Sequence, residues 1–226
     1  MKFAWIVEPP FNYRQGGALT GCDVELARHL FAALGVTFEA VEADFADLLD
    51  GLTNGRWDVA TGMFVTPQRS LRAAFTKPIW ALRDGLLIAQ ADTHVIKGYR
   101  DLARLGGKLA VLEGQVQHQT AIAVGIPEAS IVTFRAYDEA AQAVENGRVR
   151  AYASVELAHR AHVANVRGLA CAAVDISEKP SEPGAFACRN EALRDRLNLC
   201  LDGFLGSAGH RSMLLGLGLD PVSLGF

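Results

Sequence analysis

An arginine at the start of a predicted helix is the residue of this chain that is best placed to bind an anion. Residues 58–69 read DVATGMFVTPQR, where an apolar run breaks at Gly62 and the pair Thr66-Pro67 precedes Arg69. Thr followed by Pro is typical of a helix start, so Arg69 lies in the first turn, where a positive charge opposes the helix dipole. Its planar guanidinium matches a carboxylate, and we therefore expect Arg69 to bind one. The alternative is an ordinary solvated first-turn arginine.

Sequence motifs for other chemistry are missing. The chain has no G-x-S-x-G, H-E-x-x-H, Walker or G-x-G-x-x-G motif. His159 and His162 could share a metal ion, but no third ligand of matching spacing accompanies them, and we expect surface or interlobe histidines. No cysteine pair has C-x-x-C spacing, so free thiols are expected rather than structural zinc; the four are Cys22, Cys171, Cys188 and Cys200. The sequence thus predicts no metal, no cofactor and no catalytic residue.

The bulk composition indicates a globular protein that binds neither nucleic acid nor lipid. Of the 226 residues, 50% are hydrophobic and 21% are charged, and the formal net charge is -3. No basic run interleaved with aromatic residues is present, so we expect no nucleic-acid partner. Apolar runs fall short of the ~20 residues that span a bilayer, so we expect no direct membrane insertion. The opening residues lack the apolar core of a signal peptide, and a protein whose signal had been removed would look the same.

Predicted strands and helices alternate along the first 90 residues. Apolar residues recur at helical spacing after Gly21, with Asp23 as the expected cap at the start and Gly35 at the end. A second leucine-rich helix is expected to end at Gly55. The predicted strands are Lys2–Val7, 36–41 and 58–63, and the predicted helices are 22–35, 44–55 and a third from Pro67.

The same alternation restarts after residues 84–90 and predicts two α/β lobes. The expected strands are 108–112, 130–134, 151–155 and 183–189, and the expected helices are 115–124, 137–147, 156–165, 191–206 and 208–215. Such alternation favours mainly parallel sheets flanked by helices. Pro180, Pro183 and Gly184 mark a second break. We expect lobe 1 to comprise 1–90 and 182–226, and lobe 2 to comprise 91–181, so that two hinge crossings make a cleft.

Four blocks of the sequence resemble a known family over nearly the whole chain and in the right order. They are EPPFNYRQGGALTGCDVELARHLFAALGV, LLDGLTNGRWDVATGMFVTPQRSLRAAFTKPIW, GGKLAVLEGQVQ and AAQAVENGRVRAYASV. These blocks resemble the type II periplasmic solute-binding proteins of amino-acid ABC transporters, that is, the bacterial extracellular solute-binding proteins of family 3. The T-P-x-R block that contains Arg69 is the most specific part. The resemblance implies two lobes that close on a small ligand.

The resemblance also implies roles for residues of lobe 1. Arg69 would grip the α-carboxylate of the ligand, and Gly62 and Phe64 would present backbone groups to it. Thr66 is a helix cap, a ligand contact or both, and Phe45 is either a wall of the pocket or a core anchor. Two further candidates follow the first strand. Glu8 either binds a cationic or amide group of the ligand or is a solvated loop carboxylate, and Phe11 is a ligand contact or a structural plug.

In lobe 2 the resemblance points to two turns. Backbone N–H groups at a strand-to-helix turn would meet the carboxylate from the other side; the turn comprises Gly114, Gln115, Val116 and Gln117. Relatives usually carry an aspartate for the ligand ammonium where this chain has Val155, flanked by Ser154 and Glu156. Glu156 could replace it, or the ligand lacks a free ammonium. The sequence motif around Arg69 also resembles that of the ectoine-binding branch of the family. This resemblance favours a modified or cyclic amino acid as the ligand.

Three functions follow as hypotheses. The first is a monomeric periplasmic receptor that binds a small carboxylate and delivers it to an ABC transporter permease. The second is a dehydratase on the same scaffold, which would recruit Glu8, Glu113 or Glu156 as an acid. The third is the sensor domain of a larger signalling receptor. The resemblance favours the receptor, which is not an enzyme.

Overall fold

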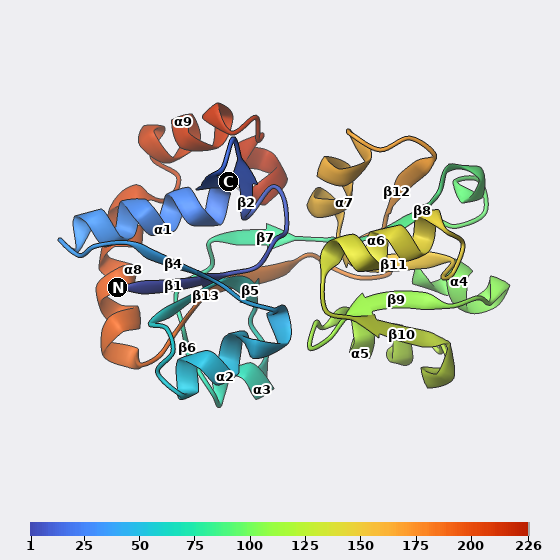
Figure 1. The fold of residues 1–226 in the computed structure, drawn as a ribbon, viewed down its shortest axis with the longest axis horizontal. Helices are drawn as coiled ribbons and strands as arrows, with labels where there is room; N and C mark the ends of the chain where they lie inside the picture. Colours follow the sequence, from blue (N-terminus) through green and yellow to red (C-terminus); the bar gives the residue numbers. More distant parts are fainter. Residues whose placement is uncertain (226) are drawn as a thin grey trace. The chain divides into compact units, whose positions relative to one another are not determined.

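The computed structural model describes residues 1–225 and divides into two compact units. Unit 1 comprises Met1–Leu82 and Glu182–Phe226, and unit 2 comprises Arg83–Ser181. In each unit helices flank a main sheet, so the expected α/β class is confirmed (Figure 1).

The main sheet of unit 1 combines parallel and antiparallel strands. Its order is β4-β1-β5-β13-β6, and β7 also pairs with β13. β1 is parallel to β4 and β5, as the alternation predicts. β13 is antiparallel to β5, β6 and β7; the chain leaves unit 1 at the end of β7 and returns at the start of β13. The strands are β1 (Lys2–Trp5), β4 (Glu39–Glu42), β5 (Val59–Phe64), β6 (Ala74–Phe75), β7 (Trp80–Leu82) and β13 (Glu182–Cys188).

Helices cover both faces of this sheet. Figure 1 shows α1 (Cys22–Ala33) on one side and α2 (Leu48–Thr53) with α3 (Pro67–Ser70) on the other. On the α2 side, a buried cluster includes Leu48, Leu52, Trp57 and Met63. The remaining elements of unit 1 are β2 (Tyr13–Gln15), β3 (Ala18–Thr20), η1 (Phe45–Asp47), α8 (Glu191–Phe204), α9 (Ala208–Gly216) and η4 (Pro221–Leu224).

Asp23 does not cap α1, contrary to the expectation from sequence. The N-cap is Gly21, with φ 122° and no side-chain cap. A Cβ at Gly21 would lie 2.2 Å from the carbonyl oxygen of Phe11, so glycine alone fits this close approach. The helix therefore begins one residue before Asp23, and the Asp23 side chain is turned to a different set of partners.

Unit 2 has a five-stranded sheet of order β10-β9-β11-β8-β12. β9 is parallel to β10 and β11, and β8 is antiparallel to β11 and β12. The strands are β8 (Asp84–Ala89), β9 (Leu109–Leu112), β10 (Ile131–Phe134), β11 (Ala151–Val155) and β12 (Leu169–Ala173). The helices are η2 (Gln90–Asp92), α4 (Tyr99–Leu105), α5 (Gln117–Ala123), η3 (Glu128–Ser130), α6 (Tyr137–Glu145) and α7 (Glu156–Val163). Sequence patterns did not predict β12.

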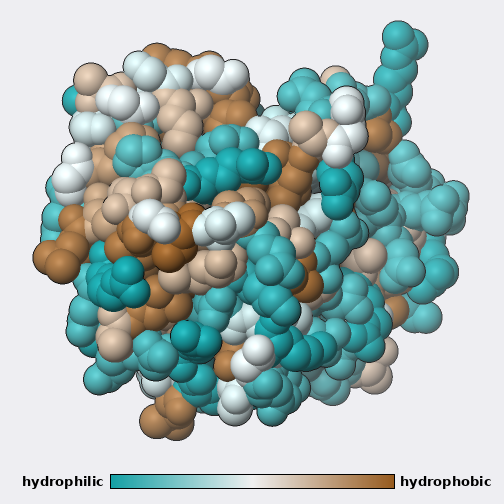
Figure 2. Space-filling view, turned by 60° about the vertical axis from the view of Figure 1, so that its left-hand side comes forward, coloured by the Kyte–Doolittle hydropathy of each residue, from teal (hydrophilic) through white to brown (hydrophobic). Residues whose placement is uncertain are grey.

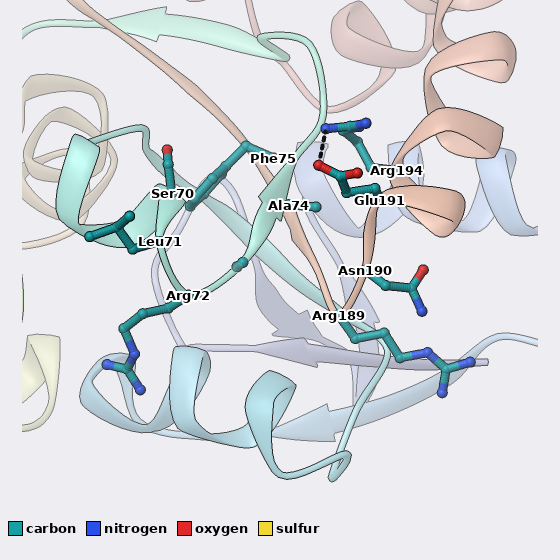
Figure 3. Close-up of a pocket in the computed structure, with 10 residues that line it drawn as sticks. Ser70, Leu71, Arg72, Ala74, Phe75, Arg189, Asn190, Glu191 and Arg194 are labelled. Atoms are coloured by element: carbon teal, nitrogen blue, oxygen red, sulfur yellow. Dashed lines mark ion pairs between the residues drawn. The ribbon is translucent and has the colours of Figure 1, made fainter.

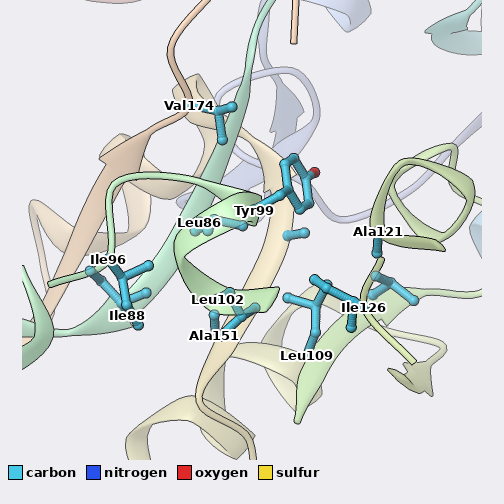
Figure 4. Close-up of a cluster of buried hydrophobic side chains, with 12 residues drawn as sticks. Leu86, Ile88, Ile96, Tyr99, Leu102, Leu109, Ala121, Ile126, Ala151 and Val174 are labelled. Carbon is cyan, nitrogen blue, oxygen red and sulfur yellow. The ribbon is translucent and has the colours of Figure 1, made fainter. Parts of the chain in front are cut away.

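The core of unit 2 is a contiguous apolar cluster between this sheet and its helices. Leu86 and Ile88 of β8 pack with Tyr99 and Leu102 of α4 and with Leu109 of β9, and all five are at most 1% exposed (Figure 4). Burial of such side chains stabilises a domain by roughly 1.5–3 kcal/mol each. β8 thus belongs to the centre of unit 2.

This placement of β8 moves the first boundary between the units. The sequence places the crossing near residue 90, whereas the structure divides the chain between Leu82 and Arg83. β8 pairs along its length with β11 and β12 of unit 2. An apolar strand of this kind carries no local signal of which sheet it will join.

One face of the molecule carries mostly hydrophilic side chains (Figure 2). Figure 2 shows hydrophilic side chains over much of the face that it presents, with smaller groups of hydrophobic ones among them. Leu71, just after α3, is 89% exposed. Within residues 1–225, no helix is long and apolar enough to cross a membrane. The four cysteines are free thiols, as expected.

Gly51→Ala is expected to destabilise the protein, although alanine is the better helix former. A Cβ at Gly51, inside α2, would lie 1.9 Å from Cζ2 of Trp57. Trp57 is buried and donates from Nε1 to the Leu48 carbonyl at 2.8 Å, so it has little freedom to move. Overpacking costs about 1–3 kcal/mol, which exceeds the ~1 kcal/mol that alanine gains over glycine in a helix.

Denaturant unfolding of the variant should therefore show a loss of about 1–2 kcal/mol in the free energy of unfolding. Gly203→Ala is the matched control, because Gly203 lies in α8 and a Cβ there meets nothing within 4 Å. Equal stability of the Gly51 variant and wild type would show that Trp57 repacks freely.

Candidate functional site

The strand-to-helix turn after β5 positions Arg69 as the sequence predicts. Thr66 is the N-cap of α3, and its Oγ1 accepts a hydrogen bond from the Arg69 backbone N–H at 3.2 Å. Pro67 follows at the first helical position. The arginine is only 8% exposed, which excludes the solvated alternative. Thr66 is thus a helix cap, and its part in ligand contact stays a prediction.

The Arg69 guanidinium is held by two neighbours in unit 1. Its Nη1 donates to the Phe64 carbonyl at 2.7 Å, and its Cζ lies 5.2 Å from the centroid of the Phe45 ring. Burial lowers the pKa of Arg69 to about 10, while the charge of Glu182 acts in the opposite direction. The side chain is therefore a buried cation at neutral pH, stacked on an aromatic face.

Gly62 is engaged within the protein rather than open to a ligand at its amide. Its N–H donates to Oδ2 of Asp23 at 2.8 Å. The same oxygen accepts from Oγ1 of Thr61 at 2.8 Å, and Oδ1 accepts from Nε1 of Trp80 at 3.2 Å. Thr61 also accepts from Nδ2 of Asn12 at 2.8 Å. Sequence patterns did not predict this buried network, because Asp23 resembled a helix cap.

Aromatic rings adjoin this network. Phe64 is 6% exposed and meets Trp80 edge-on, with centroids 5.4 Å apart and planes at 87°. Phe11 is 3% exposed and lies 5.9 Å from Trp80. Phe11 thus packs against Trp80, and its contact with a ligand stays a prediction. Glu8 is 9% exposed and its backbone pairs with Asn12, so it is not the solvated loop carboxylate that one alternative described.

In unit 2 the turn after β9 contains the four residues expected there. Gly114 has φ 80°, which favours glycine, and Val116 is the N-cap of α5. The Gln117 side chain lies in the core, where its Nε2 donates to Oδ1 of Asp84 at 3.0 Å. Oε1 of Gln115 is buried without a hydrogen-bond partner. The Gln115 backbone N–H donates to the Leu112 carbonyl at 3.1 Å. The part of this turn in binding an anion stays a prediction, and the Gln117 side chain stabilises the core.

The end of β11 places Glu156 among arginines. Ser154 and Val155 are buried, and Val155 is the N-cap of α7. The Glu156 carboxylate accepts hydrogen bonds from Nε and Nη2 of Arg83 and from Nε of Arg160. Burial raises the pKa of Glu156, but these hydrogen bonds outweigh it and hold the pKa below its ordinary value. Glu156 is thus an ionised carboxylate already bound by two cations.

His159 is not a surface histidine. It is 0% exposed, and its Nδ1 lies 2.7 Å from the Tyr137 hydroxyl. Burial lowers the pKa of His159 to about 3, so the ring is neutral. His162 lies half-buried beside Tyr137. Among residues 1–225 no group of three or more His, Cys, Asp or Glu could hold a metal ion.

A separate hollow of about 430 Å³ lies in unit 1 between the α3–β6 segment and the start of α8 (Figure 3). Its lining includes Arg72, Arg189 and Arg194. Each pairs with a carboxylate: Arg72 with Asp50, Arg189 with Asp58 at 2.8 Å, and Arg194 with Glu191 at 3.7 Å. Exposed pairs of this kind contribute little energy, and Arg69 differs from all three in its burial.

These features define a class. Two α/β units joined by two chain crossings, with a buried arginine at a strand-to-helix turn, are those of a type II periplasmic-binding-protein fold. The chain belongs to the bacterial extracellular solute-binding proteins, family 3, whose family model matches residues 4–205.

Two curated relatives show the range of similarity. The chain is 28% identical to a probable amino-acid ABC transporter periplasmic-binding protein, y4tE, of Sinorhizobium fredii, over 96% of this chain and 76% of the relative. It is 30% identical to the ABC transporter arginine-binding protein 1 of Escherichia coli, over 62% of this chain and 56% of that protein.

Two solved structures share the fold. EhuB in complex with hydroxyectoine superposes with a TM-score of 0.87 and 22% identity, covering 99% of this chain and 90% of that chain. An ancestral arginine-binding protein bound to arginine gives a TM-score of 0.84 and 23% identity, covering 96% of each chain.

Proposed function

We propose that this chain is a solute-binding receptor that closes on a small amino-acid-like carboxylate and delivers it to an ABC transporter permease. The observation that supports this most is the buried Arg69. The arginine lies at a strand-to-helix turn, where ligands of α/β proteins often bind, and its planar guanidinium matches a carboxylate in fork geometry. Relatives named as amino-acid ABC transporter binding proteins support the same class. The receptor would act as a monomer in the periplasm.

Unit 2 is proposed to add backbone N–H groups from the turn Gly114–Gln117. The Gln115 N–H already donates to the Leu112 carbonyl at 3.1 Å, so the N–H groups of Val116 and Gln117 are the main candidates. The ligand is proposed to lack a primary ammonium. Two observations support this: a buried Val155 stands where the family resemblance implies an acid, and the neighbouring Glu156 is already bound by Arg83 and Arg160. The ligand would then be a modified or cyclic amino acid.

A thermal-shift screen tests both proposals. The panel contains L-arginine, L-glutamine, hydroxyectoine and glycine betaine, of which the last two lack a primary ammonium. A ligand that binds only the folded state stabilises it, so one panel member should raise the melting temperature. At 100 times its Kd, that ligand adds about 2.7 kcal/mol to the free energy of unfolding. Hydroxyectoine or betaine should give the larger shift.

The outcomes separate the claims. A shift with L-arginine or L-glutamine alone would remove the ammonium argument and leave the receptor standing. If no carboxylate in the panel changes the melting temperature, the proposal of a solute-binding receptor is contradicted. Incubation with prephenate probes the dehydratase alternative. Glu156 is not expected to act as the acid, because its ionised carboxylate is poorly suited to donate a proton. Turnover would therefore point to Glu8 or Glu113.

A further inference from the structure

We propose that Asp23 is a positioning residue of the carboxylate site in unit 1, through which protonation is transmitted to Arg69. Its carboxylate fixes both the end of β5 and the Trp80 ring, and these two in turn fix the groups around the guanidinium. The inference rests on the proposed function, which makes Arg69 a carboxylate-binding residue. The contacts of Asp23 themselves are present without any ligand.

Asp23, at the start of α1, makes hydrogen bonds to three other segments of unit 1. Its backbone N–H donates to the Phe11 carbonyl at 3.1 Å, which binds the start of α1 to the loop after β1. Its side chain takes donors from Thr61 and Gly62 of β5 and from Trp80 of β7. A residue that is 2% exposed therefore joins a helix, a loop and two strands.

Two routes lead from Asp23 to Arg69. The first is the backbone: Gly62 is two residues before Phe64, whose carbonyl accepts from Arg69 at 2.7 Å. The second is the aromatic contact between Trp80 and the Phe64 ring, 5.4 Å between centroids. A displacement at Asp23 would reach the same residue, Phe64, by both routes.

The residues along these routes are closely packed. A Cβ at Gly62 would lie 2.8 Å from both Oδ2 of Asp23 and Nε1 of Trp80. A Cβ at Gly184, on β13, would lie 1.9 Å from the Trp80 ring. Close-packed interiors transmit displacement rather than absorb it. Loss of one hydrogen bond at Asp23 is thus expected to move the neighbouring backbone or ring.

Protonation is the event that would cause such a loss. Thr61, Gly62 and Trp80 donate to the two Asp23 oxygens, and a protonated carboxyl gives up acceptor capacity. Burial raises the pKa of Asp23 to about 6, although hydrogen bonds from Thr61, Gly62 and Trp80 act against it. The groups facing it from β5, β7 and the loop are uncharged, and Cys22 on its own helix, with Sγ 3.9 Å from Oδ1, is the titratable neighbour.

Nitrogen-15 NMR of the solute-free full chain between pH 4.5 and 8 tests the inference. The cross-peaks of the Gly62 amide, the Trp80 indole and the Arg69 Nε–H should shift together with one midpoint near pH 6. In Asp23→Asn this shared transition should vanish from all three. Glu25→Gln, which removes another carboxyl of α1, is the matched control and should leave the transition intact.

Each other outcome overturns the inference. If Gly62 and Trp80 titrate while Arg69 does not, Asp23 supports the fold alone. If no peak shows the transition, Asp23 does not ionise in this range. The wild-type titration decides the matter even if Asp23→Asn fails to fold. A failed solute screen with an intact titration would remove the proposed function and keep the network.

Discussion

Arg69→Ala is expected to weaken solute binding about 100-fold or more, which corresponds to roughly 2.7 kcal/mol. The guanidinium is buried, charged and aimed by two neighbours, the Phe64 carbonyl and the Phe45 ring. Removing one partner of a buried charge pair costs about 2–5 kcal/mol, because the remaining charge loses both its partner and its solvation. The carboxylate of the solute would be left in that state.

Isothermal titration calorimetry with the panel member that gives the largest thermal shift measures this loss. Arg72→Ala is the matched control, because Arg72 is an arginine three residues away that pairs with Asp50 at the surface. That variant should bind as wild type does. Arg69→Lys should retain part of the affinity, since lysine keeps the charge but not the fork. Unchanged affinity in Arg69→Ala would place the carboxylate elsewhere.

The second large effect concerns stability. The advantage of wild type over Asp23→Asn is expected to fall by about 2.4 kcal/mol as the pH rises from 4 to 7. Burial raises the pKa of Asp23 from 3.8 to about 6 in the folded protein. Between these values the folded chain keeps a proton that the unfolded chain releases, so rising pH favours unfolding. The contribution is present in full only well below the unfolded pKa of 3.8 and is lost as the pH passes the folded pKa of about 6.

Urea unfolding of both proteins at a series of pH values measures this difference. Asparagine has nearly the same shape and does not titrate, so other ionisable groups contribute equally to both curves. Parallel curves across the range would show that Asp23 has the same pKa in the folded and unfolded chains. A difference that grows with pH would mean that its hydrogen bonds outweigh its burial.

The local features of the site could be predicted from sequence because they depend on neighbouring residues. Thr66, Pro67 and Arg69 form one turn of helix, and their spacing alone indicates the cap and the position of the guanidinium. The alternation of strands and helices likewise predicted the α/β class. Both rest on periodicity and capping, which act over a few residues.

The features that sequence patterns missed depend on distant residues. Asp23 meets Thr61 38 positions away, and Glu156 meets Arg83 73 positions away. Before folding, Asp23 is indistinguishable from a helix cap, and Glu156 resembles a free acid beside Val155. Only tertiary pairing reveals that one carboxylate organises the strand end and the other is already neutralised.

The place of β13 has a consequence for synthesis. Glu182–Cys188 lies inside the unit 1 sheet, between β5 and β6, yet it is made after the whole of unit 2. Domains generally fold as units while the chain grows, so the continuous unit 2 can fold while β5, which leads into the Arg69 turn, still has an unpaired edge. Such edges are prone to wrong pairing. The edge of β5 is thus paired only by the returning chain, after unit 2 has been made.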